Sequence, residues 1–204
     1  MALVLNGSND TITGLQINSS NIVDGSIVNA DVNASAAIAA SKLSGISAGK
    51  ILQVVSTTKS DGFSTTSSSF VDITGLSRTI TPTAASSKIH IVVSVHCGGV
   101  VNTYLGFLLL VGSTVVSRGP ASGSITRCTF STQFADPDST KTPCYTHLHS
   151  PSYSVGDTLT YKLQVLSGYQ SNRVTINTVG RDPAANASYS MNGTSTITLM
   201  EVAA

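Results

Sequence analysis

The sequence has no tryptophan, very few charged residues and only three cysteines. Asp, Glu, Lys and Arg make up 10% of the 204 residues, well below the roughly 25% usual for soluble domains. The formal net charge is +1, so the strongly basic surface that would indicate binding to nucleic acid or to anionic membranes is absent. With so few charges, little of the stability can depend on ion pairs that salt would screen.

Targeting and membrane-spanning patterns are missing as well. The start MALVLNGSND lacks the basic region and the long apolar run of a signal peptide. No stretch reaches the ~18–20 apolar residues needed to cross a bilayer, so we expect no membrane insertion. In a protein made in a reducing cytosol, Cys97, Cys128 and Cys144 are expected to be free, buried thiols.

The sequence also lacks the common catalytic motifs, including GxSxG, HExxH and a phosphate-binding glycine loop. Asp136 and Asp138 flank Pro137, an arrangement typical of turns. The only glutamate, Glu201, lies in the expected last strand, where we predict a contact between subunits or with solvent. A polysaccharide-degrading spike would need two carboxylates in one cleft. We therefore predict that the chain is no enzyme and binds no cofactor.

What is present, within residues 1–46, is an apolar residue at every fifth position. The repeated positions are Ile12, Ile17, Ile22, Ile27 and Val32. A step of five matches neither the 3.6 of a helix nor the 2 of a half-buried strand. So narrow a strip cannot enclose a core alone, but it can if copies of the chain wrap round each other or if the chain forms a solenoid. The alanine-rich stretch 33–45 either continues this step or forms a short helix.

From residue 47 onward, short apolar stretches alternate with turn signals. The main expected strands span residues 51–58, 88–97, 104–111, 124–134, 144–150, 157–166, 173–177 and 194–202, with two further short strands on either side of Gly75. Stretch 88–97 is nearly all apolar, which indicates a central strand covered on both faces. Many short strands without a helix predict a mainly β fold, an antiparallel β-sandwich or a barrel.

Three stretches resemble parts of one known family. The sequence ILQVVSTTKSDGFSTTSSSFVDITGLSRTITP, followed by SSKIHIVVSV, resembles the opening of a head domain of bacteriophage tail fibres and related virion proteins, especially marine ones. STITLMEVAA resembles the closing strand of that domain, and VDGSIVNADVNASAAIAASKLSG resembles the spacer repeats before it. The resemblance implies a homotrimer whose head is a jelly roll like that of complement and tumour-necrosis-factor proteins.

In such a trimer the five repeated residues would point to a common axis and form a continuous apolar thread. Residues 1–46 would then be the virion-attachment and shaft segment, docking to other virion proteins through residues 1–5, and residues 47–204 would be the head. We therefore expect a virion protein made in the host cytoplasm, a short tail fibre that contacts a glycan or protein of the host surface. The alternative is a capsid head fibre or decoration trimer without receptor binding.

Loop positions give the candidate binding residues. If the last strand returns toward the shaft, loop 178–193 lies at the far end, and alternating strand directions place loops 112–123 and 150–156 beside it. These loops carry Arg118, Tyr153, Arg181, Asp182, Asn186 and Tyr189. Such side chains on rigidly held loops suit glycan or protein recognition, although solvent-exposed loops without a ligand would look the same.

A histidine pair is the strongest candidate for metal binding. His147 and His149 are two residues apart on an expected strand and so share a face. Three such pairs round a trimer axis would supply six imidazoles, enough for an octahedral transition-metal site. The neighbouring residues are those of an ordinary outer strand, however, and we predict no metal.

Overall fold

The computed structural model describes residues 22, 23, 25–28, 32, 33, 36, 51–169, 171–180 and 191–204. The chain divides into two units, Met1–Ser47 and Ala48–Ala204, and all strands found among the described residues belong to the second. Among these residues we find no helix that could cross a membrane. The alanine-rich stretch 33–45 lies almost wholly outside the described residues.

The second unit is built from antiparallel strands. They are β1 (Ile51–Lys59), β2 (Phe63–Thr65), β3 (Val71–Ile80), β4 (Lys88–Ser94), β5 (Cys97–Gly99), β6 (Thr103–Val111), β7 (Thr114–Ser117), β8 (Phe130–Phe134), β9 (Thr140–Lys141), β10 (Cys144–His149), β11 (Leu159–Ser167), β12 (Val174–Ile176) and β13 (Ser195–Val202). Most expected strands are confirmed within a few residues. The expected strand 124–134 is not, because regular pairing starts only at Phe130.

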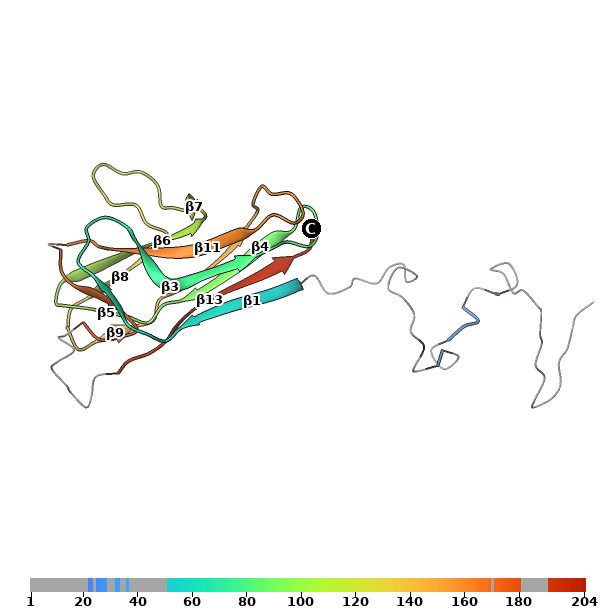
Figure 1. The fold of residues 1–204 in the computed structure, drawn as a ribbon, viewed down its shortest axis with the longest axis horizontal. Coiled ribbons are helices and arrows are strands. Elements are labelled where there is room, and N and C mark those ends of the chain that lie inside the picture. The colour runs from blue at the N-terminus through green and yellow to red at the C-terminus, as the bar shows by residue number, and fades with distance from the viewer. Residues whose placement is uncertain are drawn as a thin grey trace, which may run out of the picture. The chain divides into compact units, whose positions relative to one another are not determined.

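Two of the sheets form the sandwich (Figure 1). The first sheet has the order β1-β13-β4-β10, and the second has the order β3-β11-β6, with β7 and β8 both paired to β6. Numbered along the chain without the short strands β2, β5, β7, β9 and β12, the sheets read 1-8-3-6 and 2-7-4-5. This is the strand order of a jelly roll. The predicted antiparallel β-sandwich is therefore confirmed, whereas its assembly into a trimer remains a prediction.

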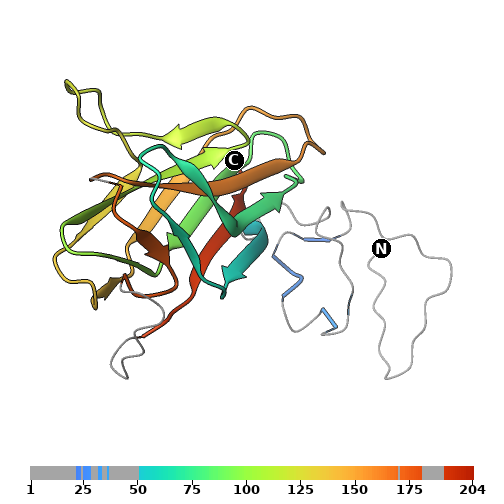
Figure 2. The same ribbon diagram turned by 60° about the vertical axis from the view of Figure 1, so that its left-hand side comes forward.

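The ends of the sandwich are set by the pairing of β1 with β13. Ile51 faces Val202 at one end, which we call the base, and Lys59 faces Ser195 at the other, which we call the tip. A third, small sheet with the order β2-β12-β5-β9 closes the tip. Figure 1 shows β5 and β9 lying together there, and Figure 2 shows the sandwich from a second direction.

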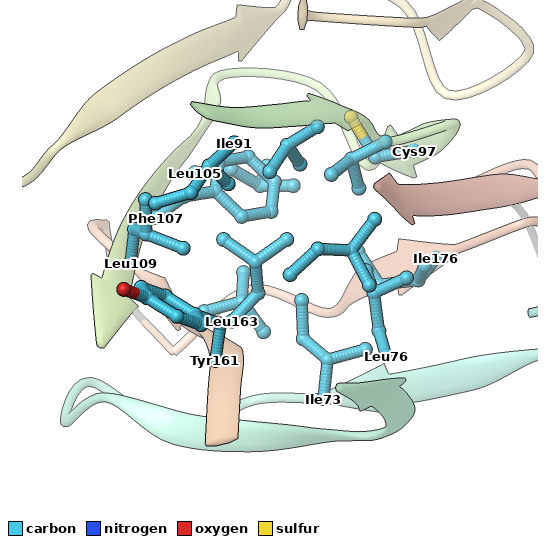
Figure 3. Close-up of a cluster of buried hydrophobic side chains, with 14 of the residues drawn as sticks. Ile73, Leu76, Ile91, Cys97, Leu105, Phe107, Leu109, Tyr161, Leu163 and Ile176 are labelled. Atoms are coloured by element: carbon cyan, nitrogen blue, oxygen red, sulfur yellow. The ribbon is translucent and has the colours of Figure 1, made fainter. Parts of the chain in front are cut away.

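Alternating side chains fill the space between the two main sheets. Ile89, Ile91 and Val93 of β4 are fully buried, and the branched and aromatic residues of β6 and β11 meet them across the gap (Figure 3). Burial of each such side chain contributes about 1.5–3 kcal/mol relative to exposure. The expectation that β4 is covered on both faces is wrong for this chain alone, because Val92 on its other face is only half-buried.

Strand β6, in contrast, is buried on both faces. Leu108 and Leu110 share its outward face with Gly106, yet both are buried. The segment that carries Cys128 lies over this face, since a Cβ added at Gly106 would be 3.5 Å from the Cβ of Cys128. The continuous apolar run of β6 therefore reflects true double burial.

Strand β3 passes through the glycine at which two separate strands were expected. Gly75 has a φ of 81°, in the left-handed region that glycine adopts without cost. The register between β3 and β11 shifts here, since Ser77 pairs with Lys162 and Asp72 with Gln164. Gly75 thus forms a bulge that bends one strand instead of ending it.

The tip is tied together by the buried side chain of Asn177. Its amide Nδ2 donates to the carbonyl oxygens of Lys59 (2.8 Å) and Asp61 (2.9 Å). Its Oδ1 accepts a 2.6 Å hydrogen bond from Ser195 Oγ. Its backbone N–H donates to His96 O, and its carbonyl accepts from Gly193 N–H. One residue therefore joins the end of β1, the β4–β5 bend and the start of β13.

Replacing Asn177 by alanine should destabilise the fold by about 3 kcal/mol, because buried carbonyl groups lose their donors. Urea unfolding measures this change. Asn102 is the matched control, since it has nearly the same left-handed φ (60° against 67°) but is exposed. Asn102→Ala isolates the backbone strain, and an equal loss in both variants would contradict the role of the Asn177 side chain.

Candidate functional site

The loop that carries Tyr153 lies at the base and not, as predicted, at the tip. β10 pairs with β4 so that His149 faces Ile89, and Ile89 also faces Glu201 near the end of β13. The segment after β10 therefore starts at the base. The Tyr153 hydroxyl donates to Ala84 O at 2.7 Å, so this half-buried side chain fastens two loops together.

Arg118 is exposed but lies away from both ends. The Gly112 turn is at the base, where Gly112 N–H donates to Thr160 O, and β7 runs back from it to Ser117 beside Leu109. Arg118 directly follows Ser117, so it lies part-way along the second sheet, beside the middle of β6. The other predicted binding residues lie outside the described residues, namely Arg181, Asp182, Asn186 and Tyr189. The structure thus does not bring Arg118 and Tyr153 together at the tip.

Three of the five residues proposed for a trimer axis are described. Ile22, Ile27 and Val32 are all exposed in the single chain, as are Val23 and Val28. Ile12 and Ile17 lie outside the described residues. The described part of the repeat therefore has apolar side chains that its own chain does not cover, and their packing on a shared axis remains a prediction.

Both histidines of the candidate metal pair belong to a row of aromatic rings that joins the two sheets. Neighbouring ring centroids in this row are 4.7–6.3 Å apart. The rings are those of Phe107, Phe130, Tyr145, His147, His149 and Tyr161. Aromatic contacts of this kind each add about 0.5–1.5 kcal/mol beyond area burial.

The row holds the imidazoles on the inner side of the first sheet. His149 Nδ1 is 2.8 Å from the Tyr161 hydroxyl oxygen. Burial, and to a smaller extent the charge of the nearby His147, lowers the pKa of His149. Burial also raises the pKa of Tyr161. Leu148, between the histidines, points to the opposite, outward face. His147 and His149 therefore do not lie on the outward face, where the histidines of three copies could meet at one metal ion.

No cluster of three or more His, Cys, Asp or Glu side chains suited to a metal occurs in the part of the chain that the structure describes. The cysteines differ in exposure: Cys97 is buried, Cys128 half-buried and Cys144 exposed. The expectation of buried thiols is therefore correct only for Cys97, where burial raises the thiol pKa to about 12.

Glu201 is fully buried, which contradicts the prediction of a contact with solvent or another subunit. Its carboxylate accepts hydrogen bonds from Gln53 Nε2 (2.7 Å) and from the backbone N–H groups of Thr83 (2.9 Å) and Ala84 (3.1 Å). Burial by itself would raise the carboxyl pKa. The hydrogen bonds outweigh burial and lower the pKa of Glu201 from 4.5 to about 2. Glu201 thus anchors the loop after β3 at the base.

The stability should therefore fall in acid through Glu201. Because the pKa is depressed in the folded state, the stabilisation is complete above about pH 4.5 and is lost as the pH falls toward 2. The shift corresponds to about 3 kcal/mol. We expect Glu201→Gln to unfold more easily than the wild type at pH 7 and to differ little from it near pH 2. A difference that does not change with pH in urea titrations would contradict this assignment.

Sequence reasoning missed a small hollow at the tip. It has a volume of about 210 Å³ and lies where β2 pairs with β12. Its lining residues are Gly62, Phe63, Ser64, Arg173, Thr175 and Thr178. Arg173 Nη2 donates to Gly180 O at 2.8 Å, which holds the guanidinium beside the hollow. β2 and β12 have three residues each, too short for a periodic pattern to reveal their pairing.

Two solved structures are similar to this chain. No family model matches the chain, and no curated protein matches it. A solved structure of infectious bursal disease virus, Gx strain, is similar with 14% identity and a TM-score of 0.37, over 74% of this chain and 37% of that one. A solved structure of the Gt strain is similar with 16% identity and a TM-score of 0.23, over 74% of this chain and 38% of that one. The chain thus spans less than two fifths of either neighbour, and similarities of this degree assign neither family nor function.

Proposed function

We propose that the chain is a non-enzymatic structural protein of a virion, a short trimeric tail fibre whose head contacts the host surface. The fibre resemblance and the five-residue repeat support this proposal. Its main structural support is the outward face of the first sheet near the base, where aliphatic side chains are uncovered in the single chain, whereas Ser and Thr residues occupy this face toward the tip. In the proposal this face packs against two further copies, and residues 1–46 attach the trimer to other virion proteins.

Two rows of side chains run across this face near the base. Val54 pairs with Met200, Met200 with His90, and His90 with Leu148. Val54 is 55% and Leu148 49% exposed, unusually high for aliphatic residues at matched positions of one sheet. In the next row Ile51, 54% exposed, faces Val202.

The same face carries almost no charge. Alternation places the residues of β1, β13, β4 and β10 outward in turn, and Lys88 is the one Lys, Arg, Asp or Glu side chain among the outward residues of these strands. Depletion of charge together with exposed aliphatic side chains is typical of the core of an interface between copies. A closed ring of three copies would bury this face in every copy.

The assembly can be tested by light scattering on the full chain. We expect three times the 20.9 kDa chain mass for the wild type. Val54→Glu should reduce it to one chain mass, because three carboxylates would be buried in an apolar contact. Ser77→Glu, on an exposed position of β3 in the other sheet, should stay trimeric. A monomeric wild type, or a Val54→Glu variant that remains trimeric, would contradict the proposed interface.

Host contact needs its own experiment. Excess purified protein should slow the adsorption of intact particles to host cells, and labelled antibody should mark the tail. If the label lies on the capsid and removal of the protein leaves adsorption unchanged, the alternative of a decoration trimer replaces the tail fibre.

A further inference from the structure

We propose that the row of aromatic rings is an acid-sensitive contact, which holds strand β10 to the second sheet near neutral pH and releases it when His147 and His149 bind protons. In the described sheet order β10 is an edge strand of the first sheet, beside β4. Its inward side chains are Tyr145, His147 and His149, whereas Leu148 points outward. These three inward rings therefore make the contact of β10 with the second sheet.

The row reaches the second sheet at both of its ends. Tyr145 stacks on Phe130 of β8, with ring centroids 5.5 Å apart. At the other end the ring of His149 lies edge-on to that of Tyr161 of β11, at 5.8 Å. His147 lies between, 6.2 Å from Tyr145 and 6.3 Å from His149. If both histidines leave the row, Tyr145 alone still attaches β10 to the second sheet.

The hydrogen bond between His149 and Tyr161 requires a neutral imidazole. Tyr161 is fully buried, and burial raises the pKa of its hydroxyl, so the hydroxyl keeps its proton and donates it. Its partner in the part of the chain that the structure describes is His149 Nδ1, at 2.8 Å. Nδ1 can accept only while the imidazole is neutral and carries its proton on Nε2. A second proton would leave the buried hydroxyl without an acceptor, which is unfavourable.

The surroundings do little to stabilise a positive charge on these histidines. Among the described residues neither histidine forms an ion pair. Glu201 lies in the same cross-strand row as His149, but Ile89 separates them and backbone N–H groups already bind the carboxylate. The titratable or charged side chains on the elements packed round the pair are Tyr145 on β10, Tyr161 on β11, the exposed Arg78 on β3, Glu201 on β13, Lys88 and His90 on the outward face of β4, and Tyr153 and the exposed Asp157 in the loop after β10.

The sign of the pH effect follows from burial. Burial, and to a smaller extent the charge of His147, lowers the pKa of His149 below its ordinary 6.5. On a released β10 the imidazole is not buried and binds protons more tightly. The contact is therefore fully formed above about pH 6.5 and weakens as the pH falls through the lowered pKa. Two protonated rings with centroids 6.3 Å apart would also repel each other.

Release of β10 would also act on the proposed assembly. Leu148, between the two histidines, is 49% exposed and belongs to the outward row that we propose to contact other copies. Acid should therefore weaken the contact between copies at the pH that frees the strand. This consequence rests on the proposed trimer, whereas the acid-sensitive contact lies within one chain and does not.

Hydrogen–deuterium exchange measured by mass spectrometry tests the contact on the full-length protein. After correction for the intrinsic effect of pH on exchange, the amides of β10 should exchange about tenfold faster at about pH 5 than at about pH 7.5, the factor that one unit of pKa difference supplies. The amides of β6 should change little, because the edge strand is released without unfolding of the second sheet.

Variants assign the effect to the histidines. His149→Asn keeps an acceptor near the position of Nδ1 and His147→Phe keeps a ring, and neither new side chain titrates. The double variant should therefore lose the acid response of β10. His90→Asn makes the same change on the outward face of the neighbouring strand and should respond like the wild type. If the double variant does not fold, NMR titration of the wild-type histidines replaces it, and His149 should titrate below pH 6.5.

The outcomes separate this contact from the proposed trimer. Unchanged exchange of β10 in acid, equal acceleration in β6, an acid response that persists in the double variant, or titration of His149 at or above pH 6.5 overturns the contact. The same measurement on Val54→Glu excludes an indirect effect of dissociation. If β10 responds to acid in the wild type but not in Val54→Glu, the response reports separation of the copies, and the contact within the chain is wrong while the trimer stands. If the wild type is a monomer and β10 still responds, only the trimer fails.

Discussion

The buried amide of Asn177 is the constraint on which the tip of this sandwich depends. β1 and β4 both leave the first sheet at the tip, and β13 enters it there, so three backbone bends must lie together without exposed partners. The Asn177 side chain binds the segment after β1 and Ser195 of β13, and its backbone N–H binds His96 O in the β4–β5 bend. Its left-handed backbone accommodates the turn that follows β12. Because Asn177 directly follows β12, the same hydrogen bonds fix the small third sheet to the first sheet.

The base is also held together by the hydrogen bonds of one buried side chain, Glu201. Glu201 accepts hydrogen bonds from the backbone N–H groups of the loop after β3 and from the neutral side-chain amide of Gln53. A carboxylate that is satisfied by amides needs no buried cation, whose desolvation would be costly. The base thus relies on uncharged hydrogen-bond donors, whereas the tip also contains the ion pair of the buried Lys59 with Asp61.

The sequence predicted the strands well and the ends poorly, for a physical reason. Alternation of apolar and polar residues in β11 predicts directly which face of the strand is buried. Whether a loop lies at the base or at the tip, however, depends on every reversal of chain direction before it. Short strands such as β5 and β9 add reversals without a readable pattern, so Tyr153 was placed at the wrong end. Glu201 lies on the inner face together with Leu199, but no sequence pattern predicts that backbone N–H groups bind its carboxylate. The jelly-roll order came from resemblance rather than periodicity.

The proposed trimer would leave three surfaces of the head uncovered. If copies cover the outward face of the first sheet, the second sheet, the base and the tip remain. On the second sheet Asp72 is already bound by Lys162 and Gln164, so those polar groups satisfy each other. The base is occupied by loops that Tyr153 and Glu201 fasten. In the described part of the chain, the tip has a small hollow and the exposed rings of Tyr104 and Tyr169.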